Sequence, residues 1–128
     1  MQGCIACNKC GELGRCVFRD ELYDTLHGKL AGADGLVVGS PTYNAELFPE
    51  VEHLLRKIEA RCVPTRNFGF FGSFCWAGAA VRRMKEFAER MKWEPICTPV
   101  EMKQGFDARS YDAARTLAEQ VAARFNEQ

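Results

Sequence analysis

The sequence predicts an α/β protein whose parallel sheet is covered by helices on both faces. Two short apolar runs bounded by glycine or a turn, residues 35–40 and 68–74, are typical of strands buried on both sides. Segments with apolar residues at helical spacing alternate with these strands, which is the order expected of crossover connections in a parallel sheet. A chain of 128 residues is long enough for one hydrophobic core, so we expect a single domain over residues 1–128.

Helices are expected before, between and after the strands. Asp20 is suited to cap the first, which runs to about Gly32. The next two span about residues 48–60 and 79–92, and Ser110 is expected to cap the last. The apolar residues expected to face the core are Leu22, Leu26 and Leu30 in the first helix; Val51, Leu54, Leu55 and Ile58 in the second; Ala80, Met84, Phe87, Ala88 and Met91 in the third; and Ala113, Ala114, Leu117, Val121 and Phe125 in the last.

A third strand is expected over residues 95–102, and its prolines suit an edge position better than a central one. In parallel sheets, ligands bind beyond the carboxyl ends of the strands. The loops at residues 40–44 and 73–78 follow the first two strands at these ends. We therefore expect the two loops to converge on one cleft.

Charge and composition exclude several classes of function. Seventeen acidic and seventeen basic side chains are interspersed and give a formal net charge of zero, so no broad field attracts nucleic acid or an anionic membrane. No signal-peptide or transmembrane stretch is visible, and we expect a reducing cytoplasm, where clustered cysteines more often hold metal than disulfides. Three scattered cysteines, Cys62, Cys75 and Cys97, are expected to be packing residues.

Four cysteines near the N-terminus, Cys4, Cys7, Cys10 and Cys16, have spacing suited to a metal centre. Two residues between successive cysteines let one tight loop direct the first three sulfurs inward. The gap of five residues before Cys16 lets the fourth sulfur close the site. Thiolates in this arrangement suit a four-iron four-sulfur cluster or zinc. The remaining interpretation is that the thiols are free or become disulfides during handling. We expect residues 1–19 to form this metal loop ahead of an α/β body over residues 20–128.

Two segments support a family resemblance. The run Gly39-Ser40-Pro41-Thr42-Tyr43-Asn44 resembles the second flavin loop of flavodoxin-like proteins. The run Gly72-Ser73-Phe74-Cys75-Trp76-Ala77-Gly78 resembles their third loop, and it is most like that of the flavodoxin domain of flavodiiron proteins. The N-terminal part, from Gly3 through the cysteines to the first of these loops, looks like the iron-sulfur flavoproteins of the NAD(P)H-dependent FMN reductase superfamily.

The resemblance implies a flavodoxin-like three-layer sandwich that binds FMN, with a four-iron four-sulfur cluster held by the four N-terminal cysteines. Hydrogen bonds to the flavin are expected from Ser40, Thr42, Asn44 and Ser73, and ring stacking from Tyr43 or Trp76. Ordinary strand-to-helix turns are the alternative interpretation of both loops. The implied cofactor-binding residues are Ser40, Pro41, Thr42, Tyr43, Asn44, Ser73, Phe74, Cys75, Trp76 and Gly78.

This sequence departs from the superfamily pattern at its start. Members begin with a strand, a phosphate-binding loop, a helix and a second strand, whereas here the cysteine segment begins at residue 4. The fold is therefore expected to be truncated at the N-terminus. The missing strand would leave the edge of the strand at residues 36–39 unpaired, and we expect a second copy of the chain or a partner to cover it.

The implied function is that of an electron-transfer flavoprotein or flavin reductase, an oligomer that exchanges electrons with a redox partner protein or NAD(P)H. Flavin and cluster would carry the redox chemistry, so no catalytic acid or base is expected, and His27 and His53 are expected to be surface or interface residues. One alternative is a flavin-free module whose cysteine loop holds structural zinc or iron-sulfur in an assembly. Another is a flavin reductase without a cluster.

Overall fold

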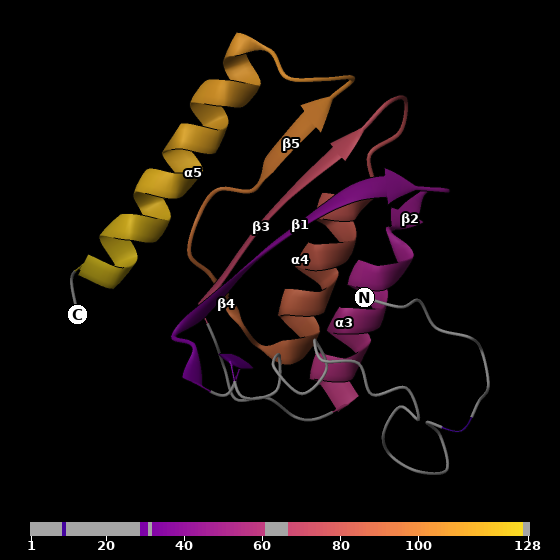
Figure 1. Ribbon diagram of the computed structural model, residues 1–128, viewed down its shortest axis with the longest axis vertical. Helices are drawn as coiled ribbons and strands as arrows, with labels where there is room; N and C mark the ends of the chain where they lie inside the picture. The colour runs from indigo at the N-terminus through magenta and orange to yellow at the C-terminus, as the bar shows by residue number, and fades with distance from the viewer. Residues whose placement is uncertain (1–8, 10–28, 31, 61–66, 127–128) are drawn as a thin grey trace.

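A computed structural model of the chain describes residues 9, 29–30, 32–60 and 67–126. Strands and helices alternate along these residues, and the helices lie on both sides of one sheet (Figure 1). This arrangement confirms the predicted α/β class. In chain order the elements are β1 (Gly35–Tyr43), β2 (Glu46–Leu47), α3 (Pro49–Ala60), β3 (Asn67–Phe74), α4 (Ala80–Met91), β4 (Glu94–Pro95), β5 (Val100–Lys103) and α5 (Ala108–Asn126).

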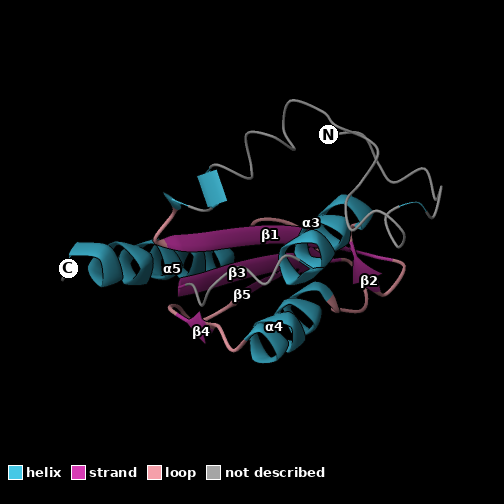
Figure 2. Cartoon of the chain, turned by 90° about the horizontal axis from the view of Figure 1, so that it is seen from below, coloured by secondary structure: helices cyan, strands magenta, loops and turns pink. Residues whose placement is uncertain are grey.

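The centre of the sheet is the parallel pair β1 and β3. Their register runs without a break from Gly35 opposite Asn67 to Pro41 opposite Ser73. On the other side of β3, both β4 and β5 pair with it in parallel, and Figure 2 shows β1, β3 and β5 side by side. Both expected central strands are confirmed.

The sheet is mixed, whereas the sequence predicted a wholly parallel one. Short β2 pairs antiparallel with the end of β1, with Tyr43 opposite Glu46. The turn between them consists of Asn44 and Ala45, whose φ angles of 48° and 60° are both positive. Two left-handed residues are the geometry of a two-residue hairpin turn, so the chain folds back here instead of forming a simple loop.

The strand predicted over residues 95–102 is two short strands, β4 and β5, separated by four residues. The Ile96 N–H donates to the Phe68 carbonyl oxygen at 3.1 Å, but Pro99 has no N–H to continue the ladder. The interruption agrees with an edge position, which is confirmed because β3 is the partner of both pieces within the described residues.

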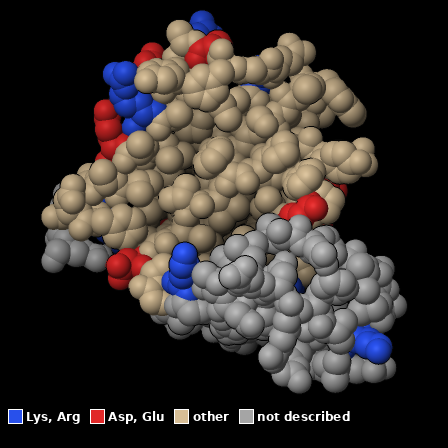
Figure 3. All heavy atoms as spheres, in the orientation of Figure 1, with Lys and Arg blue, Asp and Glu red and all other residues tan. Residues whose placement is uncertain are grey.

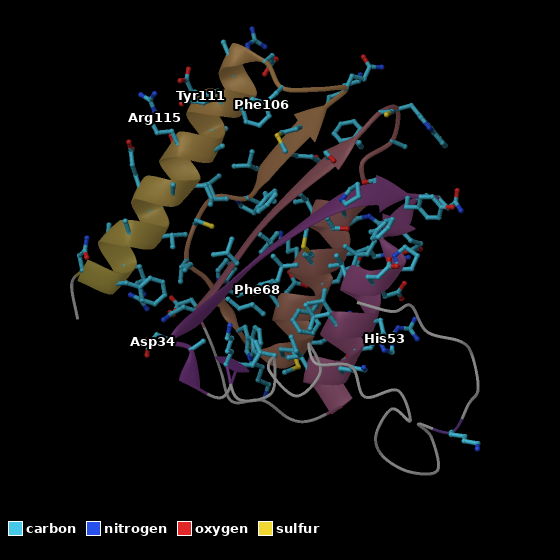
Figure 4. The ribbon with its side chains drawn as sticks, in the orientation of Figure 1. Asp34, His53, Phe68, Phe106, Tyr111 and Arg115 are labelled. Atoms are coloured by element: carbon cyan, nitrogen blue, oxygen red, sulfur yellow. The ribbon has the colours of Figure 1, made fainter. Side chains whose placement is uncertain are left out.

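The core lies between the sheet and the helices α3 and α4. Phe68 (labelled in Figure 4) and Phe70 from β3 are almost fully buried in this core. The Phe68 ring lies 5.7 Å from that of Phe87 and 5.6 Å from that of Trp93. Leu30 and Leu36 also pack against this cluster. Gly72 permits the close approach of α4, since a Cβ there would lie 3.2 Å from that of Ala80.

On the opposite face lies α5, which packs on β5 and reaches β1 at Gly35, where a Cβ would lie 2.6 Å from the Phe125 ring. The cap of α5 differs from the prediction. The Asp107 carboxylate accepts the Ser110 N–H at 2.7 Å and the Ser110 hydroxyl at 2.7 Å. Asp107 is therefore the capping residue, and Ser110 lies in the first turn as its partner.

Three predictions concern residues that lie outside the described part: those for Cys62, for His27 and for most of the helix over residues 20–32. His53 is partly buried on α3, and that burial, together with the nearby Lys57 and Arg56, holds its pKa below the usual value. Among the described helices, none is long and apolar enough to cross a membrane.

Candidate functional site

The predicted loop at residues 40–44 is largely strand, because β1 continues to Tyr43. Ser40, expected to hydrogen-bond a flavin, is 3% exposed. Its hydroxyl donates to the Pro41 carbonyl oxygen at 2.8 Å and accepts the Phe48 N–H at 3.0 Å. Ser40 therefore fixes the start of α3, while Pro41 lies at the exposed surface.

Thr42 also has a structural partner. Its hydroxyl oxygen accepts the backbone N–H of Ala79 at 3.1 Å and that of Ala80 at 3.2 Å. These are free N–H groups at the start of α4, where Ala79 supplies no side-chain cap of its own. Thr42 thus caps α4 from strand β1 and joins the end of β1 to the start of that helix.

The residues that do face outward at the end of β1 are Tyr43 and Asn44. The Tyr43 ring is about half exposed and lies 6.1 Å from the Phe48 ring in an edge-to-face arrangement. Phe48 was not among the predicted site residues, since the sequence placed it inside a helix. This pair forms an exposed aromatic ledge beside the hairpin turn.

At the end of β3, Ser73 and Phe74 still belong to the strand and are partly buried, and the chain bends at Cys75 and Trp76. Trp76 is 83% exposed, the highest value of any large apolar side chain in the described part. Cys75 is exposed as well, so the expectation that it is a packing residue is wrong.

Cys97, by contrast, is buried as expected, and burial raises the pKa of its thiol.

Two further residues lie against this bend. A Cβ at Gly78 would lie 2.5 Å from a carboxylate oxygen of Glu101, so the Glu101 side chain packs on the loop. The Gln104 N–H donates to the Phe74 carbonyl oxygen at 2.8 Å. The turn after β5 therefore belongs to the same edge, which the sequence did not indicate because the third strand was expected to end at residue 102.

An ion pair braces the hairpin against α4. Arg83 binds the Glu46 carboxylate on β2 and also contacts Glu86 one turn along its own helix. The hydrogen bonds from Arg83 lower the pKa of both carboxyls below the usual range. The ion pair between Arg83 and Glu46 therefore holds β2 against α4, and with it the neighbouring Tyr43.

A cleft of about 610 Å³ lies between α3 and α4 and reaches β2 at Glu46 and Leu47. Its arginines are all paired: Arg56 with Glu52, Arg90 with Glu59, and Arg83 as described above. No charge in this part of the described surface is left for an anionic ligand, so the strand ends remain the better candidate site.

The residues at the strand ends fit the ring of a flavin better than its phosphate. Tyr43 at the end of β1 and Trp76 just after β3 offer exposed aromatic surfaces, and Asn44 and Ser73 offer polar groups in the same two segments. The N–H groups at the start of α4, which could bind phosphate, donate instead to the Thr42 hydroxyl oxygen.

The four cysteines predicted to bind metal, Cys4, Cys7, Cys10 and Cys16, lie outside the described residues. Within the described part, no three histidine, cysteine, aspartate or glutamate side chains come together as a metal site.

Sequence comparison finds flavoprotein relatives. No family model matches. The rubredoxin-oxygen oxidoreductase of Megalodesulfovibrio gigas is 28% identical over 100 residues, which is 78% of this chain and 25% of the relative. An iron-sulfur flavoprotein of Methanocaldococcus jannaschii is 38% identical over 63 residues, 49% of this chain and 30% of the relative. The chain thus spans about a quarter to a third of the length of these relatives.

Solved structures agree on the fold. Rubredoxin oxygen:oxidoreductase from the anaerobe Desulfovibrio gigas superimposes with a TM-score of 0.69 at 29% identity, covering 74% of this chain and 24% of that one. A flavodoxin from the domain Archaea superimposes with a TM-score of 0.66 at 17% identity, covering 80% of this chain and 73% of that one.

The strand order, the helix placement and these neighbours define a flavodoxin-like α/β protein, as the sequence predicted. The chain is similar in sequence to proteins named as an iron-sulfur flavoprotein and a rubredoxin-oxygen oxidoreductase, and it shares the flavodoxin-like fold.

Proposed function

We propose that this chain takes part in electron transfer as a flavoprotein and holds the isoalloxazine ring of FMN at the carboxyl ends of β1 and β3. One observation carries the proposal: the exposed Tyr43 ring lies at the end of β1, and the exposed Trp76 ring follows the end of the adjacent parallel strand β3, at the edge where such sheets bind ligands. Exposed aromatic side chains are well suited to stack on a planar ligand.

The residues around these rings have separate roles. Trp76 and Tyr43 would contact the ring system, while Asn44 and Ser73 would supply hydrogen bonds to its polar edge. Thr42 would hold the two strand ends at a fixed spacing through its bonds to Ala79 and Ala80. A bound flavin supplies redox chemistry with one or two electrons, and the protein then needs no acid or base of its own.

The second redox group in the proposal is a four-iron four-sulfur cluster held by Cys4, Cys7, Cys10 and Cys16. The support is the chemistry of the donor set, four thiolates within thirteen residues of sequence, together with the relative named as an iron-sulfur flavoprotein. A protein redox partner agrees with the name of the rubredoxin-oxygen oxidoreductase. NAD(P)H is the alternative donor.

The test is a visible spectrum with elemental analysis of the full chain, purified without oxygen. The proposal expects broad absorbance near 400 nm, as iron-sulfur and flavin chromophores give, with about four irons per chain. A colourless protein with stoichiometric zinc would contradict the cluster and favour a structural metal loop. A protein that contains iron but takes up no flavin would contradict the flavin site and leave the cluster proposal intact.

A further inference from the structure

The turn at the end of β1 is strained. Asn44 and Ala45 both have left-handed φ angles, 48° and 60°. Asparagine tolerates this conformation because its short side chain can bond to the local backbone, whereas the Cβ of alanine comes too close to the carbonyl oxygen that follows it. Two-residue turns of this kind prefer glycine at their second position, where this chain has Ala45. The turn therefore depends on support from elsewhere in the fold.

The strand that follows the turn is too short to give this support. In the register of the hairpin, Thr42 lies opposite Leu47 and Tyr43 lies opposite Glu46, and β2 ends there. A hairpin with so short a ladder has little stability of its own. Leu47 is 6% exposed and holds the far end of β2 in the core. Glu46 lies between this buried residue and the strained turn.

Glu46 is held by α4. Both of its carboxylate oxygens accept hydrogen bonds from Arg83, one from Nε and one from Nη2. The third guanidinium nitrogen, Nη1, donates to Glu86 at 3.1 Å, and Glu86 also accepts from Arg82 at 3.1 Å. A two-point contact between arginine and a carboxylate fixes orientation as well as distance, and the second carboxylate restricts the guanidinium further. Arg83 is thus a fixed support for the residue that follows the turn.

The pair belongs to the helix side of the sheet. Figure 3 looks onto β1 with α4 behind the sheet, and the middle of the described surface there carries no charged side chain. On the α4 side, Arg83 is 36% and Glu46 is 46% exposed, so water partly screens their attraction. The position of the pair matters more than its strength, because it acts directly beside the turn.

We propose that Arg83 and Glu46 are positioning residues for the flavin-ring site. By holding Glu46, Arg83 keeps the strained turn closed. The closed turn keeps Asn44 at the strand end together with Tyr43, which lies directly opposite Glu46. This role rests on the proposed function, since Tyr43 and Asn44 are the residues assigned there to the ring. Neither member of the ion pair has to touch the ligand.

The test measures FMN binding to the full chain and its variants by fluorescence titration. Glu46→Gln keeps the size of the side chain and removes its charge. We expect it to raise the Kd for FMN about three- to tenfold, because the turn opens and Tyr43 is displaced. Glu59→Gln is the matched control. Glu59 binds Arg90 at 3.0 Å in an ion pair that joins α3 to α4, away from the turn, so its loss should leave the Kd unchanged.

Ala45→Gly distinguishes positioning from direct contact. Glycine adopts the left-handed conformation without strain, so the turn no longer depends on the ion pair. Adding Ala45→Gly to Glu46→Gln should therefore return the Kd to within about twofold of the wild-type value. If Glu46 contacted FMN itself, the second substitution could not restore the affinity. A Kd that stays raised in the double variant would overturn the positioning role.

Hydrogen exchange of the flavin-free chain tests the turn without any ligand. Backbone amides of residues 43–47 should exchange at least about threefold faster in Glu46→Gln than in the wild type, and adding Ala45→Gly should restore their protection. Amides of β3 should exchange alike in every variant, which shows that the fold is intact.

Two further results separate this role from the proposed function. If the wild type binds FMN but Glu46→Gln changes neither the Kd nor the exchange rates, the positioning role is wrong and the flavin site stands. A wild-type chain that binds no FMN would contradict the proposed function. The exchange rates would then decide by themselves whether the ion pair holds the turn.

Discussion

The hydroxyl oxygen of Thr42 on β1 lies 3.1 Å from the backbone nitrogen of Ala79, the residue that opens α4. A side chain from one strand thus caps the helix that follows the next strand. The two segments resembling flavin loops are held together by this bond before any ligand is present. A threonine expected to contact flavin therefore has a structural role that the sequence pattern did not reveal.

Replacing Thr42 with valine should lower the free energy of unfolding by about 1–2 kcal/mol, because the N–H groups of Ala79 and Ala80 lose their acceptor. Urea denaturation followed by circular dichroism measures the change. Thr42→Ser is the control, since it retains the hydroxyl and should lose much less. Equal stability of the valine variant and the wild type would contradict the capping role.

Adjacent phenylalanines on β3 should differ sharply in their effect on stability. Phe70 is 1% exposed in the core, and its replacement by alanine should cost about 3–5 kcal/mol. Phe71 points to the open face, so Phe71→Ala should cost only about 1 kcal/mol. Chemical denaturation of both variants checks the assignment of the two faces, which similar losses would contradict.

Trp76→Ala should weaken FMN binding about tenfold without changing the unfolding free energy, because the ring is 83% exposed and has no aromatic partner among the described residues. Fluorescence titration with FMN gives the affinity and thermal unfolding gives the stability. Phe71→Leu, a change in an exposed ring away from the strand ends, should leave FMN affinity unaltered. An unchanged affinity in the tryptophan variant would remove Trp76 from the site.

The cap of α5 should make stability depend on pH. Hydrogen bonds from Ser110 lower the pKa of the Asp107 carboxyl in the folded chain. A carboxyl with a lowered folded pKa stabilises the fold above its unfolded pKa, about 3.9, and loses that contribution as the pH falls through the folded value. Thermal unfolding of Asp107→Asn between neutral and acidic pH should therefore show a weaker acid dependence than that of the wild type. Parallel curves for the two proteins would contradict the contribution.

Apolar periodicity was sufficient to predict the α/β class, the two central strands and the helices that became α3, α4 and α5. Apolar periodicity did not predict the features that depend on local backbone geometry. The left-handed turn at Asn44 and Ala45 creates β2, and the missing N–H of Pro99 divides the last strand. Neither effect leaves a signal in hydrophobic spacing.

The strand ends stay the predicted site, but the structure gives some of the residues predicted for it a different role. The exposure of Tyr43 and Trp76 agrees with the loop resemblance, whereas Ser40 is buried and bonded to the backbone. A polar residue in a loop-like motif can satisfy either a ligand or the chain itself. Only the three-dimensional contacts, such as that between Thr42 and Ala79, distinguish the two.

The measurement that tests the central claim most directly is a titration of FMN into the full chain, prepared without oxygen, with flavin fluorescence as the readout. Stacking of the isoalloxazine ring between Tyr43 and Trp76 predicts saturable quenching at one FMN per chain. The same titration with riboflavin, which lacks the phosphate, should reach nearly the same affinity, because the described strand ends fit the ring and not the phosphate. Fluorescence that stays unquenched at all protein concentrations would contradict the flavin site.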